Sequence, residues 1–273
     1  MLLLLFVSLV FHTLSGQNFA SYIKDNAVRI DHPDQLSDSV YYLLSPFKII
    51  MVGEMHGSNE PAQFVTSLAN LFTSMGDSVQ VGLEIPSEQM AQFLSSFTEN
   101  SIYQSDFFSN SPYQDGRQSY AWAGLISALN RNPKVQLFFF DINKEDGSPR
   151  DSMMFLKIKN QFKQHPNWKM ITLSGNFHNR IAEGSMAFYL MRDMEIDQSS
   201  NICTLNHNYL SGACRANFGN GLEEKKIGRA ESVYDTALGI DSYLILTSFL
   251  PAYPYTGFYY TRTITAAKMT TDK

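Results

Sequence analysis

Two histidines in this chain each follow a glycine by three positions at the end of an apolar run. In KIIMVGEMHG (48–57) the run ends in Glu54 and His56, and in MITLSGNFHN (170–179) it ends in His178. Side chains two positions apart in an extended segment point the same way, so the carboxylate and the imidazole of the first motif would face one direction. Such a pair can take up or release a proton during catalysis.

Similar apolar runs elsewhere also end in ionisable residues, with Glu84 and Asp141 at or near their ends. The runs are almost continuously hydrophobic, which is typical of strands buried on both faces of a parallel sheet. The predicted strands are 47–53, 79–85, 135–142 and 169–175.

Helical stretches separate these strands, and the predicted helices are 60–75, 87–97, 118–131 and 149–165. Alternating strands and helices predict an α/β fold with a mostly parallel central sheet flanked by helices. Beyond residue 200 the runs become amphipathic, and we expect a β-rich C-terminal extension of the same sheet. The aperiodic stretch 101–116 is expected to be a long loop or a partly helical lid. We expect a single domain over 17–273.

In open α/β sheets, ligands bind beyond the carboxyl ends of the parallel strands. If these strands are parallel, Glu54, His56, Glu84, Asp141 and His178 converge on one rim. Each residue also has a purely structural interpretation. A histidine after a strand can cap a helix or hold a loop, and either strand-end carboxylate can cap a helix or serve a turn.

The ordered motifs GEMHG, LEIP, FFFD, SPRDSMM and LSGNFH resemble the erythromycin esterase/ChaN-like superfamily. Its wider TraB/Tiki relatives carry paired Gly-x-x-His motifs, and the resemblance covers about 47–192. It implies an α/β sheet with a rim site. Carried over by position, the site residues are Glu54, His56, Glu84, Arg150, Asp151 and His178.

The resemblance implies several activities, because members of this superfamily do different things. Esterase-like members hydrolyse a lactone with histidine and glutamate, Tiki-like members look like metal-dependent proteases, and ChaN-like members bind haem or iron.

Our leading expectation is an exported hydrolase of ester or amide bonds. His56, oriented by Glu54 or Glu84, would be the general base on water, and Arg150 and His178 would stabilise developing negative charge. In a metal-assisted variant, His56, His178 and Glu84 would hold Zn²⁺ or Mn²⁺ with an open position for water.

Two alternatives remain open. The first is a haem- or iron-binding protein of the bacterial envelope, in which Tyr103, Tyr113 and Tyr120 could contact the ligand. The second is an inactive scaffold that retains the rim residues.

The N-terminus has the features of a signal peptide. An apolar stretch from Leu2 to Phe11 is followed by the small residues Ser15 and Gly16. The stretch is too short for a comfortable membrane span. We therefore predict a signal peptide over 1–16, a periplasmic or secreted protein, and no membrane span after cleavage.

Cys203 and Cys214 flank a Ser-Gly pair, and in an exported chain this spacing predicts a disulfide across a hairpin-like loop. The 21 basic and 26 acidic residues give a net charge of −5. A nucleic-acid partner is not expected at this charge, because binding phosphate requires a basic face. The expected partner is a small-molecule or peptide substrate.

Overall fold

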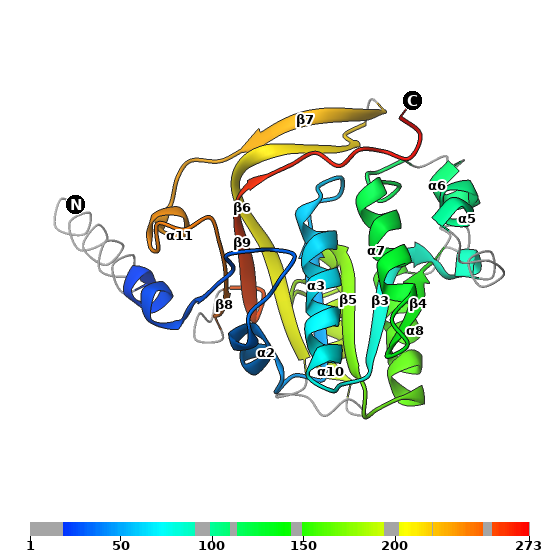
Figure 1. Cartoon of the computed structure of the whole chain (residues 1–273), viewed down its shortest axis with the longest axis horizontal. Helices are drawn as coiled ribbons and strands as arrows, with labels where there is room; N and C mark the ends of the chain where they lie inside the picture. Colours follow the sequence, from blue (N-terminus) through cyan, green and yellow to red (C-terminus); the bar gives the residue numbers. More distant parts are fainter. Residues whose placement is uncertain are drawn as a thin grey trace.

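The computed structural model shows helices on both faces of one nine-stranded sheet (Figure 1). It describes residues 19–90, 99–109, 114–142, 149–193, 202–219, 221–247 and 253–272. The predicted signal peptide over 1–16 lies outside these residues.

Four parallel strands form the half of the sheet that carries the predicted rim. They are β2 (Ile49–Glu54), β5 (Lys169–Gly175), β3 (Val79–Pro86) and β4 (Val135–Asp141), in that spatial order. Glu54 is paired with Gly175, and Pro86 with Asp141, so the carboxyl ends of neighbouring strands lie side by side. The predicted parallel arrangement is confirmed.

The other half of the sheet is formed by the C-terminal strands, as predicted. These are β6 (Ile202–Asn217), β7 (Leu222–Gly228), β8 (Ser242–Leu246) and β9 (Gly257–Ile264), with the short β1 (Val28–Arg29) at the edge. β6 runs parallel to β2 as far as Leu205 and then continues past the rim, where it pairs with β9 and β7. In Figure 1 the β6–β7 hairpin arches over the carboxyl ends of the central strands.

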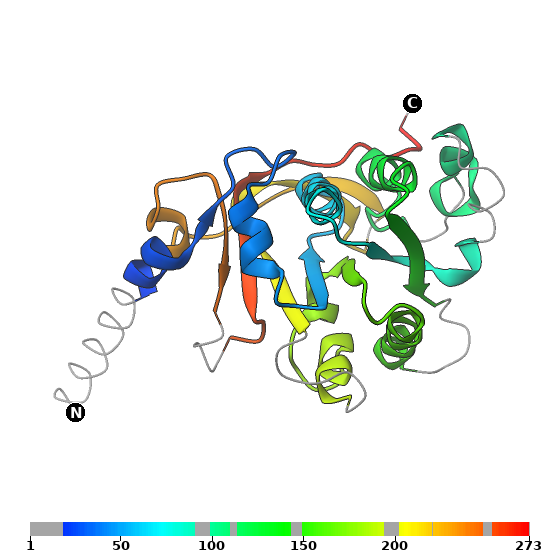
Figure 2. The same cartoon turned by 60° about the horizontal axis from the view of Figure 1, so that its bottom comes forward.

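Two layers of helices cover the sheet (Figure 2). One layer contains α2 (Asp38–Leu44), α3 (Glu60–Ser74) and α7 (Tyr120–Asn130), and the other contains α8 (Arg150–Gln164) and α10 (Met186–Arg192). β2 serves both layers, because Ile50 and Val52 pack on the first side and Ile49 and Met51 on the second. This explains its continuous apolar run. Among the described residues, no helix has the length and apolarity to cross a bilayer.

Short helices occupy several connections: η1 (Ser87–Gln89), α5 (Glu99–Gln104), α6 (Asp106–Ser109) and α9 (Asn176–Asn179) follow strands of the parallel half, and α11 (Val233–Thr236) lies between β7 and β8. The described part of the predicted 101–116 loop is thus partly helical. Of the helix predicted over 87–97, the first residues form a single 3₁₀ turn, and 91–98 lie outside the described residues.

The predicted Cys203–Cys214 disulfide is wrong. Both thiols are free and buried, and both lie on the continuous strand β6. A strand rises about 3.3 Å per residue, so the two Cα atoms are much farther apart than the roughly 7 Å that a disulfide can span. Gly212 does not form a turn. It has a φ of 133° where β6 passes too close to the Ile264 carbonyl group for any side chain.

Candidate active site

Glu84 lies at the centre of the rim, fully buried at the end of β3. Its Oε2 accepts a hydrogen bond from the Gly175 amide at 2.8 Å, and its Oε1 accepts one from Arg150 at 2.6 Å and one from Arg117 at 3.2 Å. Burial alone would raise the pKa of this carboxyl. The neighbouring cations, Arg117 foremost, instead hold its pKa below the ordinary value. Glu84 is therefore a fixed negative charge.

The first imidazole, His56, lies just beyond the end of β2. Its Nδ1 is 2.5 Å from Glu54 Oε1, and its side chain is 25% exposed. Burial opposes the charged form of the ring. The Glu54 and Glu84 carboxylates outweigh that effect and raise the pKa of His56 to about 9. At neutral pH His56 is an imidazolium.

Glu54 itself is held in place by the helix layer. Its second carboxylate oxygen accepts a hydrogen bond from the indole Nε1 of Trp122 at 3.1 Å, and both side chains are buried. Trp122 lies in the first turn of α7, where its backbone amide bonds to the capping hydroxyl of Ser119. The helix cap therefore positions the residue that orients the first histidine.

The second imidazole, His178, lies on α9 directly after β5. Its Nδ1 is 3.0 Å from both oxygens of Asp151, which is in the first turn of α8. The Met186 backbone amide donates to the same carboxylate at 2.9 Å. His178 is thus oriented in the same way as His56. Its Nδ1 contacts a carboxylate, and its Nε2 points away from that carboxylate.

Both Nε2 atoms face Glu84. His56 Nε2 is 3.9 Å from Glu84 Oε2, and His178 Nε2 is 3.5 Å from Glu84 Oε1. Gly175 separates the rings. A Cβ at this position would lie 3.3 Å from His56 Nε2 and 3.7 Å from His178 Cδ2. The glycine of the second motif therefore lets both imidazoles approach one point without displacing His56.

The six residues named from the resemblance all meet at this rim. Arg150 closes the group, because its Nη1 is 3.4 Å from His178 Nε2 while its other nitrogens donate to Glu84 and Asp141. Asp141, expected at the rim from its strand, accepts hydrogen bonds from both Arg150 and Arg117. These bonds hold its pKa below the ordinary value despite burial.

Arg117 was missed by the sequence analysis. It is almost fully buried, and Nη1 reaches the Glu84 backbone oxygen at 2.5 Å and the Asp141 carboxylate at 2.9 Å. Nε and Nη2 bind the carboxylate of Asp115. A signal was present in the charge balance. Two carboxylates at the ends of neighbouring buried strands require compensating cations, and the sequence analysis paired none with them.

The predicted metal set of His56, His178 and Glu84 does not fit a divalent cation. Both oxygens of Glu84 already accept hydrogen bonds, and two guanidinium groups lie where a metal would add further positive charge. No group of three or more His, Cys, Asp or Glu side chains in the described ranges is arranged to hold an ion. The chemistry of this site is therefore derived from its side chains alone.

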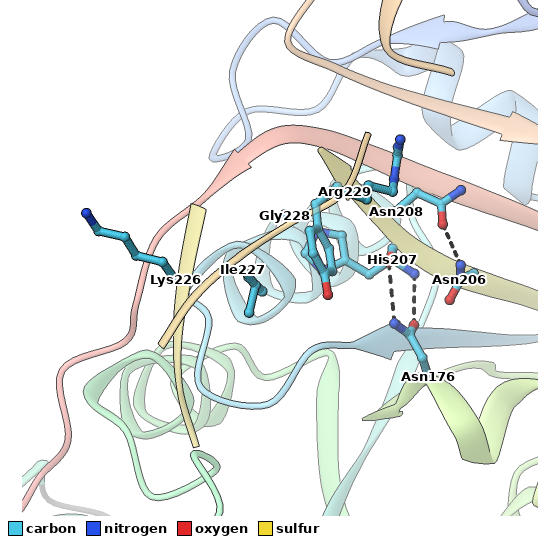
Figure 3. A pocket seen from close by; sticks show the side chains of 9 residues that line it. Asn176, Asn206, His207, Asn208, Lys226, Ile227, Gly228 and Arg229 are labelled. Atoms are coloured by element: carbon cyan, nitrogen blue, oxygen red, sulfur yellow. Dashed lines mark hydrogen bonds between the residues drawn. The ribbon is translucent and has the colours of Figure 1, made fainter. Parts of the chain in front are cut away.

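The strand β6 lies beside the rim, and Asn176 binds it there through two hydrogen bonds. The Asn176 Oδ1 accepts from the His207 amide at 2.9 Å, and its Nδ2 donates to the His207 carbonyl at 3.4 Å (Figure 3). The same amide lies against Gly53, where any side chain would collide with it. This explains the glycine of the first motif.

The remaining candidates lie away from this cluster. His207 is buried in a stack on Tyr259, with ring centroids 4.3 Å apart. Tyr103 and Tyr120 pack against each other at 5.2 Å, and Tyr113 lies outside the described residues.

Comparison with solved structures shows the fold. A protein from Bacillus cereus superposes with a TM-score of 0.65 at 9% identity, covering 93% of this chain and 99% of that one. Erythromycin esterase EreC in its open conformation gives 0.64 at 12%, covering 89% and 98%. A succinoglycan biosynthesis protein gives 0.63 at 11%, covering 93% and 98%. No protein-family model and no curated protein matches the chain by sequence.

The chain has the fold of erythromycin esterase. The similarity predicted from the ordered motifs is confirmed at this level, and it extends well beyond 47–192. At such low identity the match concerns architecture only, so the chemistry must be argued from the residues of this chain.

Proposed function

We propose that this chain hydrolyses ester or amide bonds of a small-molecule or peptide substrate at the rim. One observation carries the proposal: two imidazoles are each held at Nδ1 by their own carboxylate and each direct Nε2 at Glu84. The two imidazoles lie on either side of the negatively charged Glu84. One can act as the base and the other as the acid on the same substrate carbonyl. That the fold is shared with an esterase supports the ester class.

His178 is assigned as the base. Its Nδ1 hydrogen is donated to Asp151, which leaves Nε2 as an acceptor. Nε2 takes a proton from water while the water oxygen forms a bond to the substrate carbonyl carbon. The carbonyl π electrons move to oxygen, and Arg150 Nη1, which donates to no carboxylate of the described residues, is placed to stabilise that charge.

His56 is assigned as the acid, which exchanges the roles expected from the sequence. Because its pKa is about 9, it carries the Nε2 proton at neutral pH. When the tetrahedral intermediate collapses, the leaving oxygen or nitrogen departs with its bonding pair and takes this proton. Glu54 stabilises the imidazolium and keeps its orientation, as the carboxylate of a catalytic triad does for its histidine.

The test is hydrolysis of 4-nitrophenyl acetate, with 4-nitroacetanilide as the amide counterpart. His178→Ala is expected to lower kcat/KM by about 10²–10⁴-fold. His165→Ala is the matched control, because His165 stacks on Trp168 beyond the other end of α8 and should leave the rate unchanged. Equal rates for both variants and the native protein would refute the site.

Export is part of the proposal and is supported by the apolar stretch Leu2–Phe11 followed by Ser15 and Gly16. N-terminal sequencing of the protein recovered from outside the cytoplasm should begin at Gln17. An intact N-terminus on protein retained in the cytoplasm would contradict it. Haem or iron binding stays a prediction from the sequence resemblance, and hemin that causes no Soret shift would remove it.

A further inference from the structure

A cavity of about 570 Å³ lies beside the rim, between β6 and the end of β7. Asn176 lines it, and the preceding residue, Gly175, donates its amide to Glu84 and lies where a Cβ would meet both rim imidazoles. One residue of the chain therefore separates the cavity from the candidate active site. The volume is in the range of small-molecule sites.

The cavity is polar, but no charged side chain of the described residues is directed into it to favour an anionic or a cationic ligand. In Figure 3 the side chains of Lys226 and Arg229 point away from Asn176, and Arg229 forms two hydrogen bonds to the carboxylate of Asp235, at 2.7 and 2.8 Å. Among the described residues that line it there is no Asp or Glu. A strongly anionic or cationic ligand would thus meet no opposite charge directed inward.

Amide and phenol groups supply the hydrogen bonding. Asn206 donates to Asn208 at 2.6 Å, and both amides lie within 3.4 Å of the Tyr253 hydroxyl, which fixes their orientation. After these contacts the Asn206 amide keeps its oxygen as an acceptor, and the Asn208 amide keeps one donor hydrogen. Tyr209 and Ile227 add apolar surface to the same cavity.

We infer that this cavity binds a neutral, hydroxyl-rich group such as a sugar ring. Hydroxyls both donate and accept hydrogen bonds, as amides do, and the C–H faces of a sugar ring suit an aromatic and an aliphatic side chain. The assignment of this group as the non-reacting part of the substrate rests on the proposed hydrolase function. Binding there would hold an acyl bond of the same molecule at the rim.

The test uses methyl α-glucopyranoside and methyl β-galactopyranoside, with methyl glucuronide as the anionic probe, in ligand-observed saturation-transfer NMR. Gly228→Phe fills the cavity. Its backbone allows a side chain, because the nearest atom to a Cβ is 3.4 Å away. We expect at least fivefold weaker binding of a neutral glycoside to Gly228→Phe. Asn208→Ala, a smaller change that preserves the fold, should also weaken binding.

Lys226→Ala is the matched control, since its side chain borders the cavity but is directed outward. Neutral glycoside binding should be unchanged in this variant. The inference is overturned if no neutral glycoside binds the native protein, or if Gly228→Phe and Asn208→Ala bind it normally. It is also overturned if methyl glucuronide binds better and Lys226→Ala abolishes that preference.

Hydrolysis of 4-nitrophenyl acetate is measured on the native protein and on Lys226→Ala. This substrate is too small to occupy rim and cavity together, so the control variant should retain the native rate. Glycoside binding without hydrolysis by the native protein would contradict the proposed function alone. Hydrolysis without glycoside binding would contradict the cavity inference alone.

Discussion

Two histidines of this protein have opposite electrostatic surroundings. His56, at the rim, faces Glu54 and Glu84, which raise its pKa to about 9 against the effect of burial. His207, in β6, is 2% exposed and stacks on Tyr259, and burial lowers its pKa to about 3. Both residues lie in or directly after strands of the same sheet, yet one ring is held charged and the other neutral.

The difference lies in what encloses the ring. Removal from water disfavours the charged imidazole in both places, but only the rim supplies carboxylates close enough to reverse the shift. His207 Nδ1 is buried with no hydrogen-bond partner among the described residues, and its Nε2 is 3.4 Å from the Thr261 hydroxyl. It serves packing. Burial of a histidine therefore does not identify a site unless a partner determines its protonation.

The largest expected effect compares the two rings directly. His56→Ala should lower kcat/KM for 4-nitroacetanilide by about 10²–10⁴-fold, because it removes the proton donor that the leaving nitrogen requires. His207→Phe should leave kcat/KM within twofold, because phenylalanine can keep the stack on Tyr259. Circular dichroism of both variants checks that they fold. A comparable loss of activity in the two would break the comparison.

Arg117 tests how far the rim depends on ionic compensation. Arg117→Met leaves Asp115 without this cation and leaves Glu84 and Asp141 with Arg150 alone, and it should cost about 3–5 kcal/mol of unfolding free energy. Urea unfolding measures it.

The control for that measurement is an exposed ion pair, Arg29 with Asp31. Arg29→Met should change the free energy by about 1 kcal/mol or less, because exposed pairs are screened by solvent. If Arg117→Met lowered the free energy of unfolding by no more than Arg29→Met does, the buried network would not stabilise the rim.

The two histidines should also affect stability at opposite ends of the pH scale. The pKa of His56 is raised on folding, so its contribution is complete below pH 6.5 and is lost as pH rises through about 9. The pKa of His207 is lowered, so its contribution is complete above 6.5 and is lost as pH falls toward about 3. His56→Gln should remove an alkaline loss of about 3 kcal/mol.

His207→Phe should instead remove an acid loss of similar size. Urea titrations of the native protein and both variants between pH 4 and pH 10 measure these differences. Parallel curves for all three proteins would show that neither ring has the pKa assigned to it.

The smallest effect concerns the glycine between the two rim imidazoles. Gly175→Ala places a methyl group 3.3 Å from His56 Nε2, so the ring must shift and kcat/KM should fall about tenfold, as small misplacements do. Gly124→Ala, in α7, meets no atom within 4 Å and should leave kcat/KM unchanged. It should add about 0.5–1 kcal/mol to stability. Equal rates would mean that the spacing of the two rings is not critical.

The rim could be predicted from sequence because strand polarity does most of the positioning. Once four apolar runs were interpreted as parallel strands, the residues after them had to share one edge, and the register of β2 with β5 agrees. The pairing of each imidazole with its own carboxylate could be predicted from the sequence only in part. Glu54 and His56 are two residues apart, whereas Asp151 reaches His178 from a different helix and came only from the resemblance.

The misses lie outside the four predicted parallel strands. Arg117 and Trp122 enter the site from the connection into α7 and from the start of that helix, where no strand end marks them. The Ser-Gly pair in β6 was interpreted as a turn, but Gly212 allows two strands to approach closely. A glycine in a strand pattern allows both interpretations, and only the partner strand distinguishes them.

The most direct test of the account is the pH dependence of kcat/KM for 4-nitroacetanilide, whose nitrogen must be protonated to leave, in the native protein and in Glu54→Gln. With His56 as the proton donor, the native rate should fall above an apparent pKa near 9, and in Glu54→Gln that limb should move toward neutral pH, because the main raising partner is gone. A native rate that rises through pH 9, or an alkaline limb that does not move in Glu54→Gln, would contradict it.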